Sequence, residues 1–252
     1  MKKSLLVISV FLPFMLYAQQ NAQWRGENRN GVYNETGLLK VWPAEGPELL
    51  WHFEGLGAGF TSAAIASEKI YINTINAFNA ETGEMLWQHT IPSQNDINPN
   101  IPIYHDGMIF YTTGYRGGAW LFRLTDGGKT AELVWHNKEM DNQMGSAIKV
   151  GDYIYGSGHQ NNNWFCLNWK TGETVYRVQD IGRSNIIAAD GMFYCYSERG
   201  TMNLVKPNPE KFELVSSFRI TLGTDQHWAH PVIHRGVLYI RHGDALMAYK
   251  VK

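Results

Sequence analysis

The residues with the greatest capacity for chemistry lie near the end of the chain, where imidazole and indole side chains gather. Four of the nine histidines fall between positions 227 and 242, and His227 and His230 flank Trp228. Imidazole is the commonest metal ligand among side chains, so His227 and His230 are the candidates for a metal. Side chains three apart in a strand point to opposite faces, so joint coordination would require a curled loop. We therefore expect no metal site.

Polar residues of the same kind recur earlier in the chain, each in a segment that leads into a predicted strand. These residues are Asn100, Asn142, Gln143, Arg183 and Asn185. No GxSxG nucleophile elbow, HExxH zinc motif or phosphate-binding glycine spacing accompanies them. What they can do together therefore depends on the elements that place them.

Those elements form a repeat in which a polar turn precedes a short aromatic and β-branched strand. Glu68, Gly107, Gly151, Gly191 and Gly236 mark the five turns, at steps of 39, 44, 40 and 45 residues. A period of about 40–45 residues with several strands per unit is typical of β-propeller blades. We expect an all-β fold, a β-propeller of about five four-stranded antiparallel blades.

The last unit is expected to lack its own fourth strand. Residues 245–249 supply its third strand, and the chain ends at Lys252. Near the other end, Leu49-Leu50-Trp51-His52 matches the fourth strands around Trp87 and Trp135. We expect this N-terminal strand to pair with the last blade and close the ring, which removes two free sheet edges. The recurring Trp51, Trp87 and Trp135, with Tyr176 in the third unit, are expected to pack between blades.

In a propeller the first strands line the central channel, so the polar residues before them should meet at one channel mouth. The expected ligand-binding residues are Asn100, Asn142, Gln143, Arg183, Asn185, His227, Trp228 and His230. A ring of amide, imidazole and guanidinium donors with an aromatic suits a neutral polar ligand, such as a sugar or a peptide backbone. The alternative is that these groups order channel water and satisfy strand ends.

The N-terminus has the pattern of a secretory signal. Met1-Lys2-Lys3 precedes an apolar run from Leu5 to Tyr17, and Ala18 follows. A membrane span needs about 20 apolar residues, and this run is shorter than that. We expect a cleavable signal peptide at 1–18, an N-terminal extension at 19–48 and the propeller domain at 49–252. No cysteine stands directly after the apolar run, so we expect a periplasmic or secreted protein without a lipid anchor.

The net charge indicates which classes of partner to expect, and the cysteine positions leave two pairing states open. A net charge of −1 predicts neither nucleic acid nor an anionic membrane surface as partner. We expect a monomer that binds a small polar molecule or a protein. Cys166 and Cys195 stand 29 residues apart, and both a disulfide and two buried free thiols agree with their positions.

Two stretches carry a resemblance to a known family. The run from Ala77 to Trp87, AFNAETGEMLW, resembles the tryptophan-docking repeat of the PQQ-binding-like (quinoprotein and BamB-like) β-propellers, and residues 166–173 repeat its core. The opening Trp24–Val32, WRGENRNGV, is similar to the start of secreted members of this group. The resemblance implies the propeller fold but no particular activity. Such relatives usually carry seven or eight blades, so the resemblance implies a shortened member of the family.

The resemblance also implies what a quinoprotein dehydrogenase would need. Those enzymes use a catalytic Asp, a Ca²⁺ held by Glu and Asn, and a disulfide between adjacent cysteines against the cofactor. This chain has no Cys-Cys pair, and its acidic residues fall mostly in turns. We therefore expect no catalytic residues and no cofactor, with PQQ and Ca²⁺ as the alternative.

These observations favour an exported, non-enzymatic propeller that acts as a binding or scaffold module. Two alternatives remain. One is a quinone- or metal-dependent oxidoreductase, a descendant of the quinoprotein dehydrogenases. The other is a BamB-like adaptor in outer-membrane protein assembly.

Overall fold

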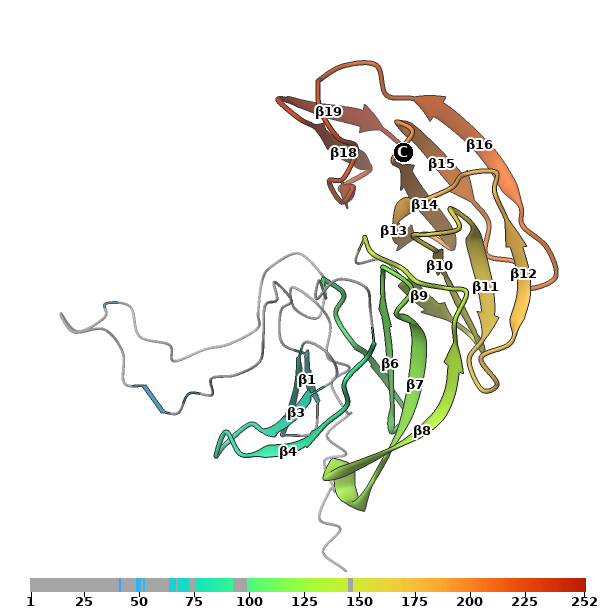
Figure 1. Cartoon of the computed structure of the whole chain (residues 1–252). Helices are drawn as coiled ribbons and strands as arrows, with labels where there is room; N and C mark the ends of the chain where they lie inside the picture. The colour runs from blue at the N-terminus through green and yellow to red at the C-terminus, as the bar shows by residue number, and fades with distance from the viewer. Residues whose placement is uncertain are drawn as a thin grey trace, which may run out of the picture.

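The computed structural model describes residues 41, 49–50, 52, 64–66, 68–72, 76–92, 99–144 and 147–252. Within this part, the strands form five antiparallel sheets that follow one another along a curved path (Figure 1). The predicted signal peptide at 1–18 and, apart from Val41, the N-terminal extension at 19–48 lie outside the described residues.

Each sheet is one blade, and its strands are consecutive in the chain. Blade 1 contains β1 (Ala64–Ala66), β2 (Lys69–Ile72), β3 (Asn76–Asn79) and β4 (Met85–Gln88). Blade 2 contains β5 (Ile103–His105), β6 (Met108–Thr113), β7 (Gly118–Thr125), the 3₁₀ turn η1 (Asp126–Gly128) and β8 (Thr130–Asn137). Blade 3 contains β9 (Ala147–Val150), β10 (Tyr153–Ser157), β11 (Trp164–Asn168) and β12 (Thr174–Val178). Blade 4 contains β13 (Ser184–Ala189), β14 (Met192–Ser197), β15 (Thr201–Val205) and β16 (Leu214–Arg219). Blade 5 contains β17 (Val232–His234), β18 (Val237–His242) and β19 (Ala245–Lys250).

The turns that join first and second strands have the conformation that their residue types favour. Asp106 and Gly107 have φ of 47° and 70°, and Asp190 and Gly191 have φ of 49° and 72°. Two positive φ values in a row define the tight hairpin turn whose twist matches that of the flanking strands. The predicted repeat of turn and strand is therefore confirmed.

A second regularity links the third and fourth strands. In each four-stranded blade the register shifts by one residue, between Ala77 and Phe78, Leu121 and Phe122, Cys166 and Leu167, and Leu204 and Val205. Such a bulge bends the strand and increases its twist. The fourth strands of blades 1 to 4 therefore bend relative to the third strands at an equivalent position.

The core lies between the blades. Four clusters of buried side chains occur among the described residues, and each combines side chains of two consecutive blades. Trp135 of β8 packs in the cluster between blades 2 and 3, and its indole Nε1 donates to the carbonyl of Trp169, 2.9 Å away. Trp87 of β4 donates similarly to the carbonyl of Gly128 in blade 2, at 3.2 Å. The predicted inter-blade packing of Trp87 and Trp135 is thus confirmed, whereas Trp51 lies outside the described residues.

The two cysteines lie in the cluster between blades 3 and 4. Cys166 and Cys195 are both free thiols and fully buried. Burial raises the pKa of Cys166 to about 11 and that of Cys195 well above its usual value. Of the two alternatives left open by the sequence, the structure has the pair of buried thiols.

The predicted closing strand is not found among the described residues. Blade 5 has three strands, and β19 pairs there only with β18. Leu49 and Leu50 belong to no strand, and 72% and 81% of their surface is exposed. Blades 1 to 4 have the predicted four strands, and ring closure stays a prediction.

Candidate functional site

The polar residues that lead into the first strands share one end of the blades with a set of turns. Because the strands of a blade alternate in direction, the start of its first strand lies beside the turn between its second and third strands. We call this end of the molecule the leading face. It carries the segments before β9, β13 and β17, and the β6–β7, β10–β11 and β14–β15 turns.

Three of the eight predicted residues are asparagines that connect backbone segments. Asn100, Asn142 and Asn185 are at most 3% exposed. The Nδ2 group of Asn100 donates to the carbonyl of Asn142 at 2.6 Å, and that of Asn185 donates to the carbonyl of Trp228 at 2.8 Å. Asn142 donates to the carbonyl of Ser157 at 2.8 Å. These amides therefore satisfy strand ends, and those of Asn100 and Asn185 also join neighbouring blades. A ligand-binding role for them stays a prediction.

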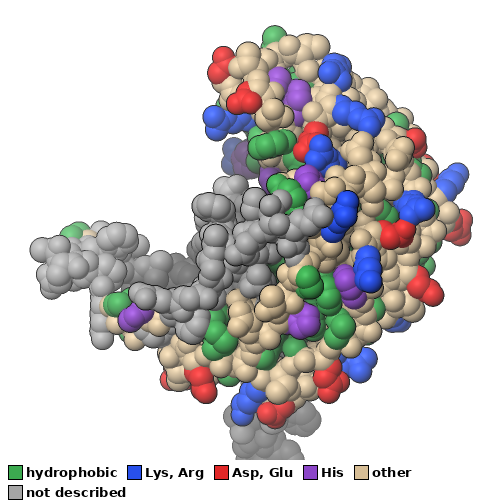
Figure 2. Space-filling view, in the orientation of Figure 1, with side chains coloured by type: hydrophobic (Ala, Val, Ile, Leu, Met, Phe, Trp, Pro, Cys, Tyr) green, Lys and Arg blue, Asp and Glu red, His purple; other side chains and the backbone are tan. Residues whose placement is uncertain are grey.

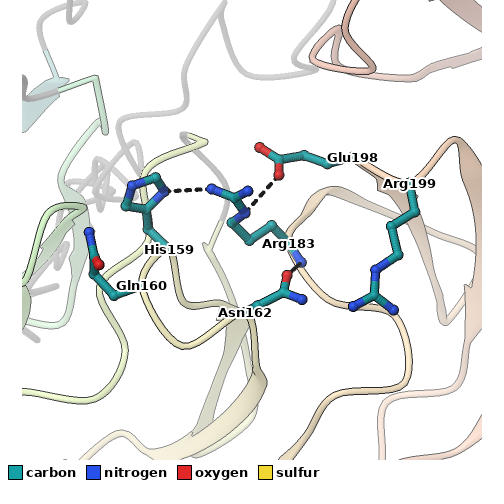
Figure 3. Close-up of a pocket in the computed structure, with 6 residues that line it drawn as sticks. All are labelled: His159, Gln160, Asn162, Arg183, Glu198 and Arg199. Carbon is teal, nitrogen blue, oxygen red and sulfur yellow. Dashed lines mark hydrogen bonds and ion pairs between the residues drawn. The ribbon is translucent and has the colours of Figure 1, made fainter.

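Arg183, a fourth predicted residue, lies in a pocket of about 480 Å³ between blades 3 and 4. Its lining residues are His159, Gln160, Asn162, Arg183, Glu198 and Arg199. Figure 3 shows the first three entering from the β10–β11 loop of blade 3, and the other three from the facing side of blade 4. We call this cavity the mouth pocket.

Arg183 organises the mouth pocket through three contacts. Its Nε forms an ion pair with Glu198 Oε2 at 2.7 Å, and its Nη1 lies 3.0 Å from Nδ1 of His159 (Figure 3). Its backbone N–H donates to Oδ1 of Asn162 at 2.9 Å. Burial and the adjacent guanidinium lower the pKa of His159. A neutral imidazole is the form that can accept a hydrogen bond from Arg183.

A buried carboxylate fixes the loop that carries His159. Asp141, 2% exposed, accepts N–H groups from Arg116 at 3.0 Å, His159 at 2.8 Å and Gln160 at 3.2 Å. Hydrogen bonds to an ionised acceptor are shorter and stronger than neutral ones, which compensates for burial of this charge. Asp141 therefore ties the β6–β7 turn of blade 2 to the β10–β11 loop of blade 3.

A line of side chains extends from Arg183 toward blade 2. The phenol ring of Tyr115 lies 4.7 Å from the ring of His159, measured between centroids. The hydroxyl of Tyr115 accepts from Nε2 of Gln143 at 2.9 Å. Gln143, a fifth predicted residue, is thereby connected with Arg183 through two side chains that the sequence did not single out.

The remaining predicted residues lie at the junction of blades 4 and 5. Nδ1 of His227 is 2.6 Å from the hydroxyl of Tyr196, and its ring stacks on His242 with centroids 3.7 Å apart. Burial, His242 and Arg219 together lower the pKa of His227. Trp228 is 60% exposed, and His230 is half-buried just before β17. No group of three His, Cys, Asp or Glu side chains suited to a metal occurs among the described residues.

Sequence reasoning did not identify most of the mouth pocket, namely His159, Gln160, Asn162, Glu198 and Arg199. A usable signal was present: all five fall in turns between a second and a third strand. In an antiparallel blade such turns must lie at the same end as the start of the first strand. The polar run from Gly156 to Asn163 begins with the last two residues of β10 and continues to the start of β11, and it thus belongs to this end.

Charged side chains of both signs are interspersed over the visible side of the arc (Figure 2). This mixture accords with the net charge of −1. Among the described residues, no helix has the length and apolar character needed to span a bilayer.

Comparison with known proteins identifies similarity in sequence and in fold. Residues 26–208 match the family described as outer membrane protein assembly factor BamB. A curated protein of that name from Shewanella oneidensis is 23% identical over 171 residues, which cover 59% of this chain and 40% of the relative.

Solved structures show the same architecture. The crystal structure of BamB from Moraxella catarrhalis superimposes with a TM-score of 0.58 at 13% identity, covering 79% of this chain and 61% of that one. Quinohemoprotein alcohol dehydrogenase from Comamonas testosteroni gives a TM-score of 0.51 at 12% identity, covering 71% of this chain and 43% of that one. This chain spans less than two thirds of the length of each of these three relatives.

Proposed function

The chain belongs to the BamB-like family of PQQ-repeat β-propellers, and from this membership we propose that it is an exported, non-enzymatic binding or scaffold module. The observation that carries the proposal is the mouth pocket, an open polar cavity on the leading face. Its groups hold one another in place: Asp141 fixes the β10–β11 loop, and Arg183 joins that loop to Glu198. A preorganised polar surface of this kind supports recognition, because little side-chain entropy is lost on binding.

The most specific form of this proposal is an adaptor in outer-membrane protein assembly. It is supported by the family match and by the BamB structure. The exposed indole of Trp228 supports it further, because large aromatic side chains on a surface are common anchors in protein interfaces. The proposal includes a periplasmic location.

A quinone-dependent oxidoreductase is the second candidate, and the fold likeness to a quinohemoprotein dehydrogenase motivates it. A Ca²⁺ that supports such a cofactor requires several converging oxygen ligands. Asp141, the buried carboxylate of the leading face, instead accepts three backbone N–H groups. A carboxylate saturated by N–H donors does not fit a calcium ligand.

Co-purification tests the proposal. Tagged full-length protein is expressed in a diderm bacterium, and the periplasmic and membrane fractions are cross-linked before purification. We expect the barrel-assembly machinery to be enriched with the wild type and reduced at least several-fold with Trp228→Ala. Leu214→Ala is the control, because it removes an exposed apolar side chain at the start of β16, which is the end of the blade opposite the leading face.

A parallel assay addresses catalysis. Purified mature protein is supplied with PQQ, Ca²⁺ and a range of alcohols and aldoses, together with an artificial electron acceptor. We expect no turnover above that of the free quinone. Reproducible oxidation of any substrate would replace the binding-module proposal with the oxidoreductase.

A further inference from the structure

We propose that the mouth pocket binds a carboxylate, with Arg199 as its ion-pair partner. This inference rests on the proposed function, because it names the chemical class of ligand that the same binding module takes. It differs from the neutral ligand that the sequence suggests for the channel mouth. Three properties of the pocket support it: the orientation of its polar groups, its charge and its size.

The polar groups of the pocket present hydrogen-bond donors. A guanidinium only donates, so Nδ1 of His159, 3.0 Å from Arg183 Nη1, must accept. The neutral ring then carries its proton on Nε2. Similarly, Oδ1 of Asn162 accepts the backbone N–H of Arg183, which leaves the Nδ2 group of that amide as a donor. Both side chains therefore use their acceptor within the protein and keep a donor for a ligand.

The charge of the pocket is positive. Glu198 forms an ion pair with Arg183 at 2.7 Å, and its negative charge neutralises the positive charge of that guanidinium. Arg199, the next residue, is exposed on the same pocket, and no ion pair is recorded for it among the described residues. With His159 neutral, the six lining residues carry two positive charges and one negative charge. A net charge of +1 is matched by one carboxylate.

Geometry and size also favour a carboxylate. The planar guanidinium of Arg199 offers paired N–H groups that match the two oxygens of a carboxylate. A cavity of about 480 Å³ is much larger than one carboxylate, so it can also hold part of the molecule that bears the group. Two sources supply that chemistry: a small organic acid, and the C-terminus of a peptide.

Titration of the mature protein with four probes separates these sources and tests the inference. The probes are succinate, its neutral diamide, a short N-acetylated alanine peptide with a free C-terminus, and the same N-acetylated peptide with an amidated C-terminus. We expect succinate, the free-acid peptide or both to bind, and each neutral counterpart to bind at least about tenfold more weakly. Binding of one acid alone identifies its source. Added salt should weaken binding, because the pocket is open to solvent.

Variants connect the binding with the named residues. Arg199→Gln should raise Kd about tenfold, since a charge-assisted pair is replaced by a neutral contact. Arg123→Gln in β7 removes the same charge from an exposed position in another blade, and it should bind like the wild type. Glu198→Gln should lower Kd several-fold, because it frees Arg183 for the ligand.

Three results would overturn the inference. Equal affinity for the acids and their amides would show that charge is not recognised. Equal affinity of Arg199→Gln and Arg123→Gln would show that Arg199 is not the partner. Failure of both acids to bind would remove the carboxylate site. In each case the co-purification experiment still decides separately whether the protein is a binding module.

Discussion

Gly172 lies at the interface between blades 2 and 3, at a position with no space for a larger side chain. Its φ is +73°, and a Cβ there would lie 2.4 Å from the indole of Trp135 in the preceding blade. Trp135 thus packs directly on the backbone of the β11–β12 turn. This close approach explains why glycine stands in the Lys-Thr-Gly-Glu turn of blade 3.

Replacing Gly172 with alanine should lower the free energy of unfolding by about 2–4 kcal/mol. About 1–2 kcal/mol comes from the left-handed backbone, and the rest from displacing the indole. Gly191→Ala is the matched control: its φ is +72°, and a Cβ would meet nothing within 4 Å. Urea unfolding of both variants gives the difference. Equal losses would mean that Trp135 moves without cost.

Histidines that are half-buried against aromatic rings make the stability pH-dependent. His136 stacks on Trp120 with ring centroids 3.6 Å apart, and its pKa is lowered, mainly by burial. The unfolded chain therefore takes up a proton near pH 6.5, before the folded protein does. Where the unfolded state binds more protons, stability falls as pH decreases. His89, His159 and His227 have pKa shifts in the same direction.

His136→Phe should reduce the loss of Tm between pH 7.5 and pH 5. The phenyl ring can keep the stacking on Trp120, and it has no proton to take up. Thermal melts at the two pH values measure the effect, and a melting temperature close to the wild type at pH 7.5 controls for packing. An unchanged loss of Tm would show that His136 titrates alike in both states.

At the scale of single residues, the sequence predicted the turns well and the pocket poorly. Gly107 and Gly191 have the positive φ that their Asp-Gly turns require, because this conformation depends on neighbouring residues alone. The contact of His159 with Arg183 joins residues 24 positions apart in two blades. It depends on the spacing between the blades and on the buried Asp141, which no local pattern encodes.

The buried asparagines act at the scale of elements. Asn185 lies at the start of β13, the first strand of blade 4, and its amide reaches the carbonyl of Trp228 before blade 5. The amide of Asn100, before blade 2, likewise reaches the carbonyl of Asn142, which lies 42 residues later and before blade 3. A spacing equal to the blade period was visible in the sequence. It indicates a repeated structural role as readily as a ring of ligand-binding groups.

Asn185→Ala should lower the free energy of unfolding by about 1–3 kcal/mol, because the carbonyl of Trp228 loses its buried donor. Asn208→Ala is the control. Its side chain bonds only within the β15–β16 loop, to Glu210 and Glu213, so its loss should be smaller. Chemical denaturation measures both. A loss at Asn185 no greater than that at Asn208 would contradict the bridging role.

Across the whole molecule, stability should vary with the number of neighbours of a blade. Among the described residues, blades 2, 3 and 4 have a buried cluster on each side, whereas blades 1 and 5 have one. Each blade contacts mainly its neighbours, as in other repeat proteins. Hydrogen exchange should therefore be slowest in β10 and β11 and fastest in β17–β19. Uniform exchange would indicate a single cooperative unit.

The same measurement tests ring closure. If residues 49–52 pair with β19, backbone N–H groups of β19 gain protection. Leu50→Pro should remove this protection, because proline lacks one N–H of the ladder and disrupts the strand whose carbonyls accept from β19. Exchange in β11 should not change, since its neighbours are β10 and β12. Val41→Pro, at a position 83% exposed and outside the predicted closing strand, is the control. Faster exchange in β19 with Leu50→Pro but not with Val41→Pro would establish a five-bladed ring. Identical exchange in the two variants would indicate an open arc, in which β19 is a free edge that could pair with another strand.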